Sequence, residues 1–190
     1  MKVCVYAICK NESQFVDRFM DSMSEADYVC VLDTGSSDDT VKKLRARGAI
    51  VGETVVSPWR FDTARNESLG LIPADADICC AIDLDEQFHP GWRAALERAW
   101  QPDTTRARYR YTWSFRPDGS EGMVFWADKI HKNGCYRWAS PVHETLSYTG
   151  EGAERFVDAA GVQLDHHPDE TKSRGQYLPL LELAVREDPQ

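Results

Sequence analysis

The alternation of two hydrophobic patterns in the first half of the chain constrains the fold most. Short apolar runs of strand length alternate with segments whose apolar residues recur at helical spacing. The apolar runs predicted as strands are residues 3–9, 28–32, 49–56 and 77–83. The segments predicted as helices are residues 13–23, 38–47, 62–71 and 90–100. Strands that are apolar on both faces and separated by helices form a mostly parallel sheet with helices on each face.

The second half of the chain has a different pattern. Residues 108–115 and 122–131 are predicted as two strands joined around Pro117-Asp118-Gly119, which is typical of a hairpin turn. A segment at 136–146 and a strand at 162–165 follow, and residues 173–187 carry an apolar helical stripe. The sequence therefore predicts one α/β domain with a smaller antiparallel second half and a C-terminal helix.

The Asp83-Leu84-Asp85 motif is the most informative local feature. It follows a fully apolar strand, and ligands of open α/β sheets bind outside the carboxyl ends of the strands. Residues two apart in extended chain point to the same side, and two like charges held together are unfavourable without a cation or a proton. With Glu86, the oxygen ligands suit Mg²⁺ or Mn²⁺ bound together with substrate phosphates. The alternative is a pair of solvated loop carboxylates.

Composition excludes several classes of protein. The 190 residues carry a formal net charge of −9, which argues against a broad surface for nucleic acid or anionic membrane. The alternating arginines and aromatic residues of 105–116 are explained more simply by a strand with one polar and one aromatic face. No apolar run approaches the roughly 18 residues that span a bilayer. The six cysteines form no CxxC or zinc-type spacing, so we expect free thiols and a cytoplasmic location.

Several motifs together resemble family 2 glycosyltransferases with the GT-A fold. They occur in that family's order and spacing: Asn11-Glu12, VLDTGSSDDT at 31–40, ARNES at 64–68 and DLD at 83–85. WRFD at 59–62, YRW at 136–138 and VHE at 142–144 resemble the bacterial and phage branch whose catalytic domain precedes tetratricopeptide-type helices. The resemblance covers essentially the whole chain, and the ordered set is more specific than any single motif.

The resemblance implies an activity and a division of the chain. The activity is metal-dependent, inverting transfer of a sugar from a nucleoside-diphosphate sugar, with UDP as the commonest donor nucleotide. A GT-A catalytic domain with a Rossmann-like sheet would span residues 1–170, with a nucleotide-sugar half at 1–100 and an acceptor half at 101–170. Residues 171–190 would begin a longer helical region or pack against a second copy in a homodimer.

The resemblance also implies the residues of the site. Donor contacts would come from Lys10, Asn11, Glu12, Asp33, Arg65, Asn66 and Asp83. Asp83, Asp85 and His166 would hold Mn²⁺ or Mg²⁺, with His166 matching the pattern better than His167. Many relatives have a second acid at the position of Thr34. Two structural alternatives stay open: that Asp33 is a turn residue bonding its own backbone, and that Arg65 pairs with an acidic neighbour on the surface.

Glu144, with His143 beside it, is the implied base that takes the proton of the acceptor. The alternative for Glu144 is a bond to the backbone or to Arg137. Trp113, Trp126 and Trp138 either stack on a sugar or a base, or pack within the protein. The acceptor is left open among a glycan, a peptide side chain and a modified nucleobase.

Two alternative functions have different sequence requirements. A sugar-phosphate nucleotidyltransferase would need a Gly-rich loop with Arg and Lys after the first strand, where this chain has Cys-Lys-Asn-Glu at 9–12. A non-catalytic nucleotide-sugar binding or scaffold module would not need Asp83, Asp85 and Glu144 together.

Overall fold

The computed structural model describes residues 1–169, 175 and 177–187. Its strands are β1 (Val3–Cys9), β2 (Tyr28–Asp33), β3 (Ile50–Glu53), β4 (Ile78–Ala81), β5 (Glu86–Phe88), β6 (Arg106–Thr112), β7 (Val124–Lys132), β8 (Tyr136–Ala139), β9 (Thr145–Tyr148) and β10 (Phe156–His166). Its helices are α1 (Val16–Ser22), α2 (Thr40–Ala46), α3 (Phe61–Leu69), α4 (Trp92–Ala99) and α5 (Tyr177–Glu187).

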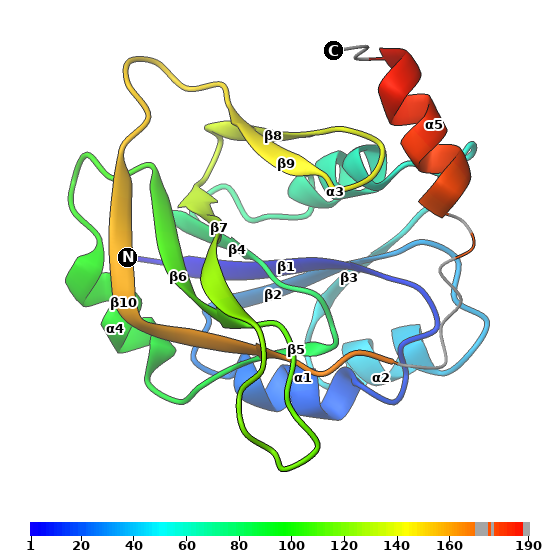
Figure 1. Cartoon of the computed structure of the whole chain (residues 1–190), viewed down its shortest axis with the longest axis horizontal. Coiled ribbons are helices and arrows are strands. Elements are labelled where there is room, and N and C mark those ends of the chain that lie inside the picture. Colours follow the sequence, from blue (N-terminus) through cyan, green and yellow to red (C-terminus); the bar gives the residue numbers. More distant parts are fainter. Residues whose placement is uncertain (170–174, 176, 188–190) are drawn as a thin grey trace.

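One 8-stranded sheet, in the order β3-β2-β1-β4-β7-β6-β10-β5, runs through the molecule (Figure 1). Strands β3, β2, β1 and β4 are parallel, as the sequence predicts. β7 is antiparallel to both β4 and β6, which confirms the hairpin predicted around Pro117-Asp118-Gly119. The second half is not a separate antiparallel unit, however, because β10 pairs parallel with β6 within the same sheet.

The two faces of the sheet are covered differently (Figure 1). Val3, Val5 and Ala7 of β1 point into the larger core, to which α1, α2 and α4 contribute. Cys4 and Tyr6, between them in sequence, point into a second core that includes residues of α3, β8 and β9. Alternate residues of one strand are thus buried on opposite faces, which is why the run reads as continuously apolar. The predicted fold class is confirmed.

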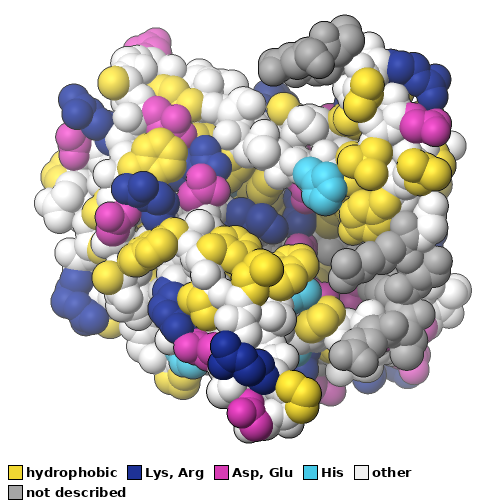
Figure 2. Space-filling view, viewed as in Figure 1, with side chains coloured by type: hydrophobic (Ala, Val, Ile, Leu, Met, Phe, Trp, Pro, Cys, Tyr) yellow, Lys and Arg dark blue, Asp and Glu magenta, His cyan; other side chains and the backbone are white. Residues whose placement is uncertain are grey.

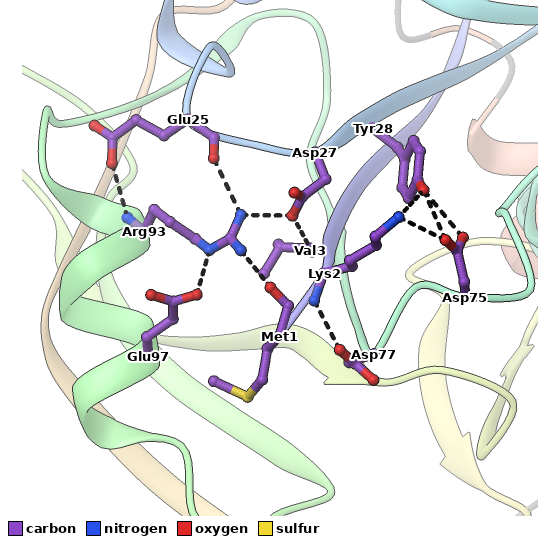
Figure 3. Close-up of polar contacts among 10 residues, drawn as sticks. All are labelled: Met1, Lys2, Val3, Glu25, Asp27, Tyr28, Asp75, Asp77, Arg93 and Glu97. Carbon is purple, nitrogen blue, oxygen red and sulfur yellow. Dashed lines mark hydrogen bonds and ion pairs between the residues drawn. The ribbon is translucent and has the colours of Figure 1, made fainter.

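An ionic network fastens the N-terminus to the amino ends of the central strands (Figure 3). Arg93 of α4 donates to the Met1 carbonyl at 2.5 Å and to Asp27 at 2.8 Å. Lys2 Nζ donates to Asp75 at 2.7 Å. These contacts leave the opposite, carboxyl edge of the sheet to the loops that carry the candidate site.

Some boundaries differ from the sequence prediction. β10 is an 11-residue strand that begins at Phe156, and β5 was not predicted at all. The described part of the predicted C-terminal helix is α5, and residues 173, 174 and 176 of that prediction lie outside the described residues. All six cysteines are free thiols. In the described part of the chain, every helix is too short or too polar to cross a bilayer.

Candidate functional site

The loops that follow β1 and β2 are bonded to each other. The Asn11 amide donates to Ser36 Oγ at 2.7 Å, and the Ser37 amide donates to Asn11 Oδ1 at 2.8 Å. The Glu12 amide donates to Thr40 Oγ1 at 2.8 Å. Lys10 is exposed at the same place. The structure thus brings the three predicted donor-site residues of 10–12 together with the 33–37 turn.

Asp33 serves its own turn. Asp33 is only 2% exposed, and its Oδ1 accepts hydrogen bonds from the backbone amides of Gly35 and Ser36 at 2.9 and 2.8 Å. The Ser36 hydroxyl donates to Oδ2. The geometry favours the turn-forming alternative for Asp33, while its role toward a nucleotide stays a prediction.

Arg65 of α3 joins two carboxylates from distant parts of the sequence. Its Nη2 donates to Asp83 Oδ1 at 2.6 Å and its Nε donates to Glu144 Oε1 at 3.1 Å. The side chain is 3% exposed and lies over the Trp138 ring, with Nη1 lacking a hydrogen-bond partner among the described residues. Arg65 therefore pairs with acidic residues, as its structural alternative has it, but its guanidinium is buried rather than on the surface. Glu144 is bonded to Arg65 rather than to Arg137.

Asn66 is also turned into the protein. Its Nδ2 donates to the Trp138 carbonyl at 2.8 Å, and the Trp138 amide donates back to Oδ1 at 3.0 Å. This pair of bonds fastens β8 to α3. The indole of Trp138 donates to Tyr6 Oη at 2.9 Å and is buried, so Trp138 packs in the core and presents no stacking surface.

Lys129 of β7 is a site residue that the sequence analysis missed. Its Nζ lies 3.9 Å from Asp83 Oδ2. Burial would raise the pKa of Asp83, but the positive charges of Arg65 and Lys129 lower that pKa to about 2. Burial lowers the pKa of Lys129, and the carboxylates of Asp83 and Glu86 more than offset this and raise it. Asp83 is therefore held as an anion between two cations.

The Glu86 side chain is buried beneath the loop that carries Asp83 and Asp85, and it is not exposed together with them. It is 2% exposed, accepts the Asp83 amide at 2.8 Å and accepts the Tyr111 hydroxyl at 2.6 Å. Burial raises the pKa of its carboxyl group. The prediction that Glu86 adds an oxygen ligand beside Asp83 and Asp85 is therefore wrong, because both of its oxygens accept hydrogen bonds within the protein.

Asp85 and His166 face each other at the end of β10. His166 Nε2 lies 3.4 Å from Asp85 Oδ2, while its Nδ1 is 3.0 Å from the Trp113 carbonyl and donates to it. The neighbouring His167 instead stacks on Phe115, so His166 is the histidine placed beside Asp85. No group of three or more metal-ligating side chains forms within the residues that the structure describes. Asp83 turns toward Arg65 and Lys129, and the pair that meets is Asp85 with His166.

A hollow opens in the molecular surface between the β8–β9 pair and the β6–β7 hairpin (Figure 2). Basic and acidic side chains lie within it, and hydrophobic side chains gather along its hairpin side. His143 is exposed and has a left-handed backbone with φ of 53°. Its ring lies 6.2 Å from that of Tyr177 in α5. His143 and Glu144 are therefore adjacent in sequence but differ in surroundings, with only Glu144 joined to Arg65.

No protein-family model matches the sequence. A crystal structure of a mycobacterial protein is similar with a TM-score of 0.60, at 17% identity over 90% of this chain and 68% of that chain. Glucosyl-3-phosphoglycerate synthase from Mycobacterium tuberculosis, in complex with Mn²⁺, UDP and glucosyl-3-phosphoglycerate, gives a TM-score of 0.48 at 26% identity over 58% of this chain. The same synthase in complex with Mg²⁺ and UDP gives the same TM-score. The match spans 44% of the synthase chain in the first complex, which is less than half its length.

The likeness over 90% of the chain indicates that the two chains share a fold. The architecture is consistent with a GT-A-like α/β fold.

Proposed function

We propose that this chain is a glycosyltransferase that moves a sugar from a nucleoside-diphosphate sugar, first of all a UDP-sugar, to a hydroxyl group of an acceptor. The observation that carries the proposal is the placement of Asp85 beside His166, next to an Asp83 held by Arg65, at the carboxyl edge of the parallel strands. The motif resemblance supports the same activity. We place the protein in the bacterial and phage branch of family 2, and in the cytoplasm, where thiols stay reduced.

The residues present fit a divalent metal ion. One carboxylate and one imidazole converge at 3.4 Å, and the Asp85 side chain is 24% exposed. A mixed oxygen and nitrogen pair suits Mn²⁺ better than Mg²⁺, although both are proposed. Asp85 and His166 would hold the ion, with Asp83 beside them. When bound, the ion would stabilise negative charge on the departing nucleoside diphosphate.

The remaining residues have proposed roles that follow from their positions. Lys10, Asn11 and Glu12, with Asp33, would contact the nucleoside at the ends of β1 and β2, and Asn66 would hold β8 beside the site. Lys129, 33% exposed at its side chain, would add positive charge near the diphosphate. Arg65 would keep Asp83 and Glu144 in place.

Glu144 would accept the proton of the attacking hydroxyl group, with His143 beside it, and the transfer would invert the anomeric carbon. Its side chain is 13% exposed and oriented by Arg65. The catalytic domain would span 1–170, and the helix of 171–190 would begin a tetratricopeptide-type region or pack against a second copy.

The proposal is tested by thermal unfolding with UDP, GDP, dTDP or CMP, each with and without Mn²⁺. A nucleotide at 100 times its dissociation constant adds about 2.7 kcal/mol, which corresponds to roughly 5–10 °C at this size. We expect one nucleoside diphosphate to give a metal-dependent shift that is lost in Asp85→Asn. Asp103→Asn, which removes a charge from an exposed residue, is the matched control and should keep the shift.

A folded wild-type protein that shifts with no nucleotide would refute the proposal. The alternative of a non-catalytic scaffold module would then lead. A shift without release of nucleoside diphosphate from any UDP-sugar would favour a nucleotide-sugar binding module.

A further inference from the structure

The connection between β6 and β7 packs on the carboxyl end of β10. In Figure 1 this connection crosses that end of the strand, and two pairs of stacked rings join the two segments. Trp113, the first residue after β6, stacks on His166 with ring centroids 4.5 Å apart and an interplanar angle of 27°. Phe115 stacks on His167 with centroids 5.1 Å apart. The histidine of the proposed metal-binding pair is therefore in direct contact with this connection.

Trp113 also bonds the same histidine through its backbone. The Trp113 carbonyl oxygen lies 3.0 Å from His166 Nδ1. A carbonyl oxygen can only accept a hydrogen bond, so the hydrogen of this bond is on Nδ1. In a neutral imidazole, Nε2 then carries the free lone pair. Trp113 thus contacts His166 twice, and its carbonyl selects the nitrogen that is left to bind a cation.

The nitrogen left free by Trp113 faces a carboxylate. His166 Nε2 lies 3.4 Å from Asp85 Oδ2, and an ionised carboxylate oxygen is also only an acceptor. Two acceptors that face each other repel unless a cation lies between them. The orientation that Trp113 gives to the neutral His166 ring therefore suits a cation shared with Asp85, and does not suit a hydrogen bond donated to it.

The backbone fixes the positions of His166 and Asp85 but does not fix the orientation of the imidazole. His166 is paired with Glu86 in the β5–β10 ladder, and the His167 amide donates to the Asp85 carbonyl at 2.8 Å. The torsion that turns a histidine ring has two broad preferred orientations. A half-turn of the His166 ring would place carbon atoms where Nδ1 and Nε2 now lie. Contacts made by the ring itself are needed to exclude that half-turn.

Trp113 is held firmly enough to provide those contacts. Its amide donates to the Met123 carbonyl at 2.9 Å across the hairpin. The centroid of its indole lies 6.1 Å from the Tyr111 ring and 6.5 Å from the Phe125 ring. The residue is nevertheless 39% exposed, so its indole covers the imidazole from the solvent side without being part of the closed core.

We infer that Trp113 is a positioning residue that holds the His166 imidazole with Nε2 directed at the cation shared with Asp85. The inference rests on the proposed function. The Trp113 carbonyl sets the tautomer of the ring, and the indole restricts its rotation. Replacing a group that orients a metal-binding histidine commonly weakens metal binding about 10–100-fold.

The alternative is that Trp113 only packs the β6–β7 connection against β10. Phe115 provides an internal comparison, because it lies on the same connection, is 36% exposed and stacks on His167 rather than on a residue of the pair. If packing is the only role, loss of either ring should affect metal binding alike. If Trp113 positions His166, the loss of its ring should have the larger effect.

The test measures Mn²⁺ binding in the presence of UDP, from the electron paramagnetic resonance signal of free Mn²⁺. Trp113→Leu keeps the backbone carbonyl and removes the flat ring, Trp113→Phe keeps a flat ring, and Phe115→Leu is the matched control. We expect Trp113→Leu to bind Mn²⁺ at least about tenfold more weakly than the wild type. Trp113→Phe and Phe115→Leu should bind Mn²⁺ almost as the wild type does. Trp113→Met replaces Trp113→Leu if the leucine variant does not fold.

A spectroscopic readout separates positioning from packing. In protein containing ¹⁵N-labelled histidine, pulsed electron paramagnetic resonance detects whether an imidazole nitrogen coordinates the bound Mn²⁺. We expect this histidine signal in the wild type, Trp113→Phe and Phe115→Leu. The signal should be much weaker in Trp113→Leu at saturating Mn²⁺, because the His166 ring is then free to turn away.

Three results would overturn the inference. They are wild-type affinity for Mn²⁺ in Trp113→Leu, equal losses of affinity in Trp113→Leu and Phe115→Leu, and an undiminished histidine signal in Trp113→Leu. Failure of the proposed function is distinguishable, because the wild type itself would then bind no Mn²⁺ in the presence of UDP. A wild type that binds Mn²⁺ without a histidine signal would refute His166 as a ligand, and the role of Trp113 with it.

Discussion

Replacement of Arg65 by leucine should unbalance the centre of the candidate site. The guanidinium is 3% exposed and bonds Asp83 at 2.6 Å and Glu144 at 3.1 Å. Arg65→Leu removes the positive charge and keeps an apolar side chain over Trp138. Two carboxylates then lose a common partner that is itself buried.

The size of the effect can be worked from these contacts. Removing one partner of a buried ion pair costs about 3–5 kcal/mol, because the other charge is left without compensation. The Asp83 side chain is 34% exposed and has Lys129 at 3.9 Å, so solvent and a second cation offset part of its loss. We therefore expect the lower end, about 3 kcal/mol, or a fall in Tm of roughly 6–12 °C.

The measurement is urea unfolding of wild type and variant, with Arg45→Leu as the matched control. Arg45 also pairs with a glutamate, Glu53, at 2.6 Å, but its side chain is 54% exposed. An exposed ion pair contributes less than about 1 kcal/mol, so Arg45→Leu should lose little stability.

A triple variant separates charge from packing. Adding Asp83→Asn and Glu144→Gln to Arg65→Leu removes the uncompensated charges and should restore most of the lost free energy of unfolding. The electrostatic explanation fails if Arg65→Leu loses no more stability than Arg45→Leu, or if the triple variant is as unstable as the single one.

Three further outcomes follow from buried groups. Burial lowers the pKa of His131 to about 4 from its ordinary 6.5, so the unfolded chain binds a proton that the folded chain does not between those values. The free energy of unfolding should therefore fall by up to about 3 kcal/mol as pH drops from 6.5 to 4. In His131→Gln, the midpoint of urea unfolding should lack this dependence on pH. Tyr111→Phe removes the hydroxyl that donates to buried Glu86, which should cost about 1–3 kcal/mol in the same assay; an unchanged midpoint would contradict that hydrogen bond. Trp92→Ala empties a fully buried site stacked on Phe88, at about 3–5 kcal/mol, and a loss below 1 kcal/mol would show that the core closes around the gap.

Much of the first half of the fold could be predicted because its signals are local. β1 and β4 are apolar on both faces, and each apolar run is long enough to be recognised without knowledge of its partners. β5 escaped prediction because it has three residues, the first of which is a buried glutamate. Only the distant Tyr111 explains why Glu86 tolerates burial, and the sequence gives no sign of that partner.

The sequence predicted which segments of the chain lie near the site, but not which side chains of those segments bond to each other. The Asp83–Glu86 loop and the His166 position lie at one edge, as expected from the strand order. Arg65 and Asn66 lie at that edge too, but their bonds run to Asp83, Glu144 and Trp138, across long stretches of sequence. Such pairings depend on side-chain directions after the sheet has formed, and hydrophobic periodicity does not encode them.

The pairing of β10 has a consequence for the order in which the molecule is built. β10 lies between β6 and β5 in the sheet, and β5 has no other strand neighbour in the described chain. The loop that carries Asp83 and Asp85 leads directly into β5. The end of this loop therefore has no strand partner until residues 164–166 have been synthesised. During synthesis from the N-terminus, the four parallel strands can associate while Asp85 still lacks both β5 pairing and His166. The candidate centre is therefore completed by β10, the last strand of the described residues, and a ribosome-bound chain ending before residue 156 should have folded parallel strands but an unfinished centre.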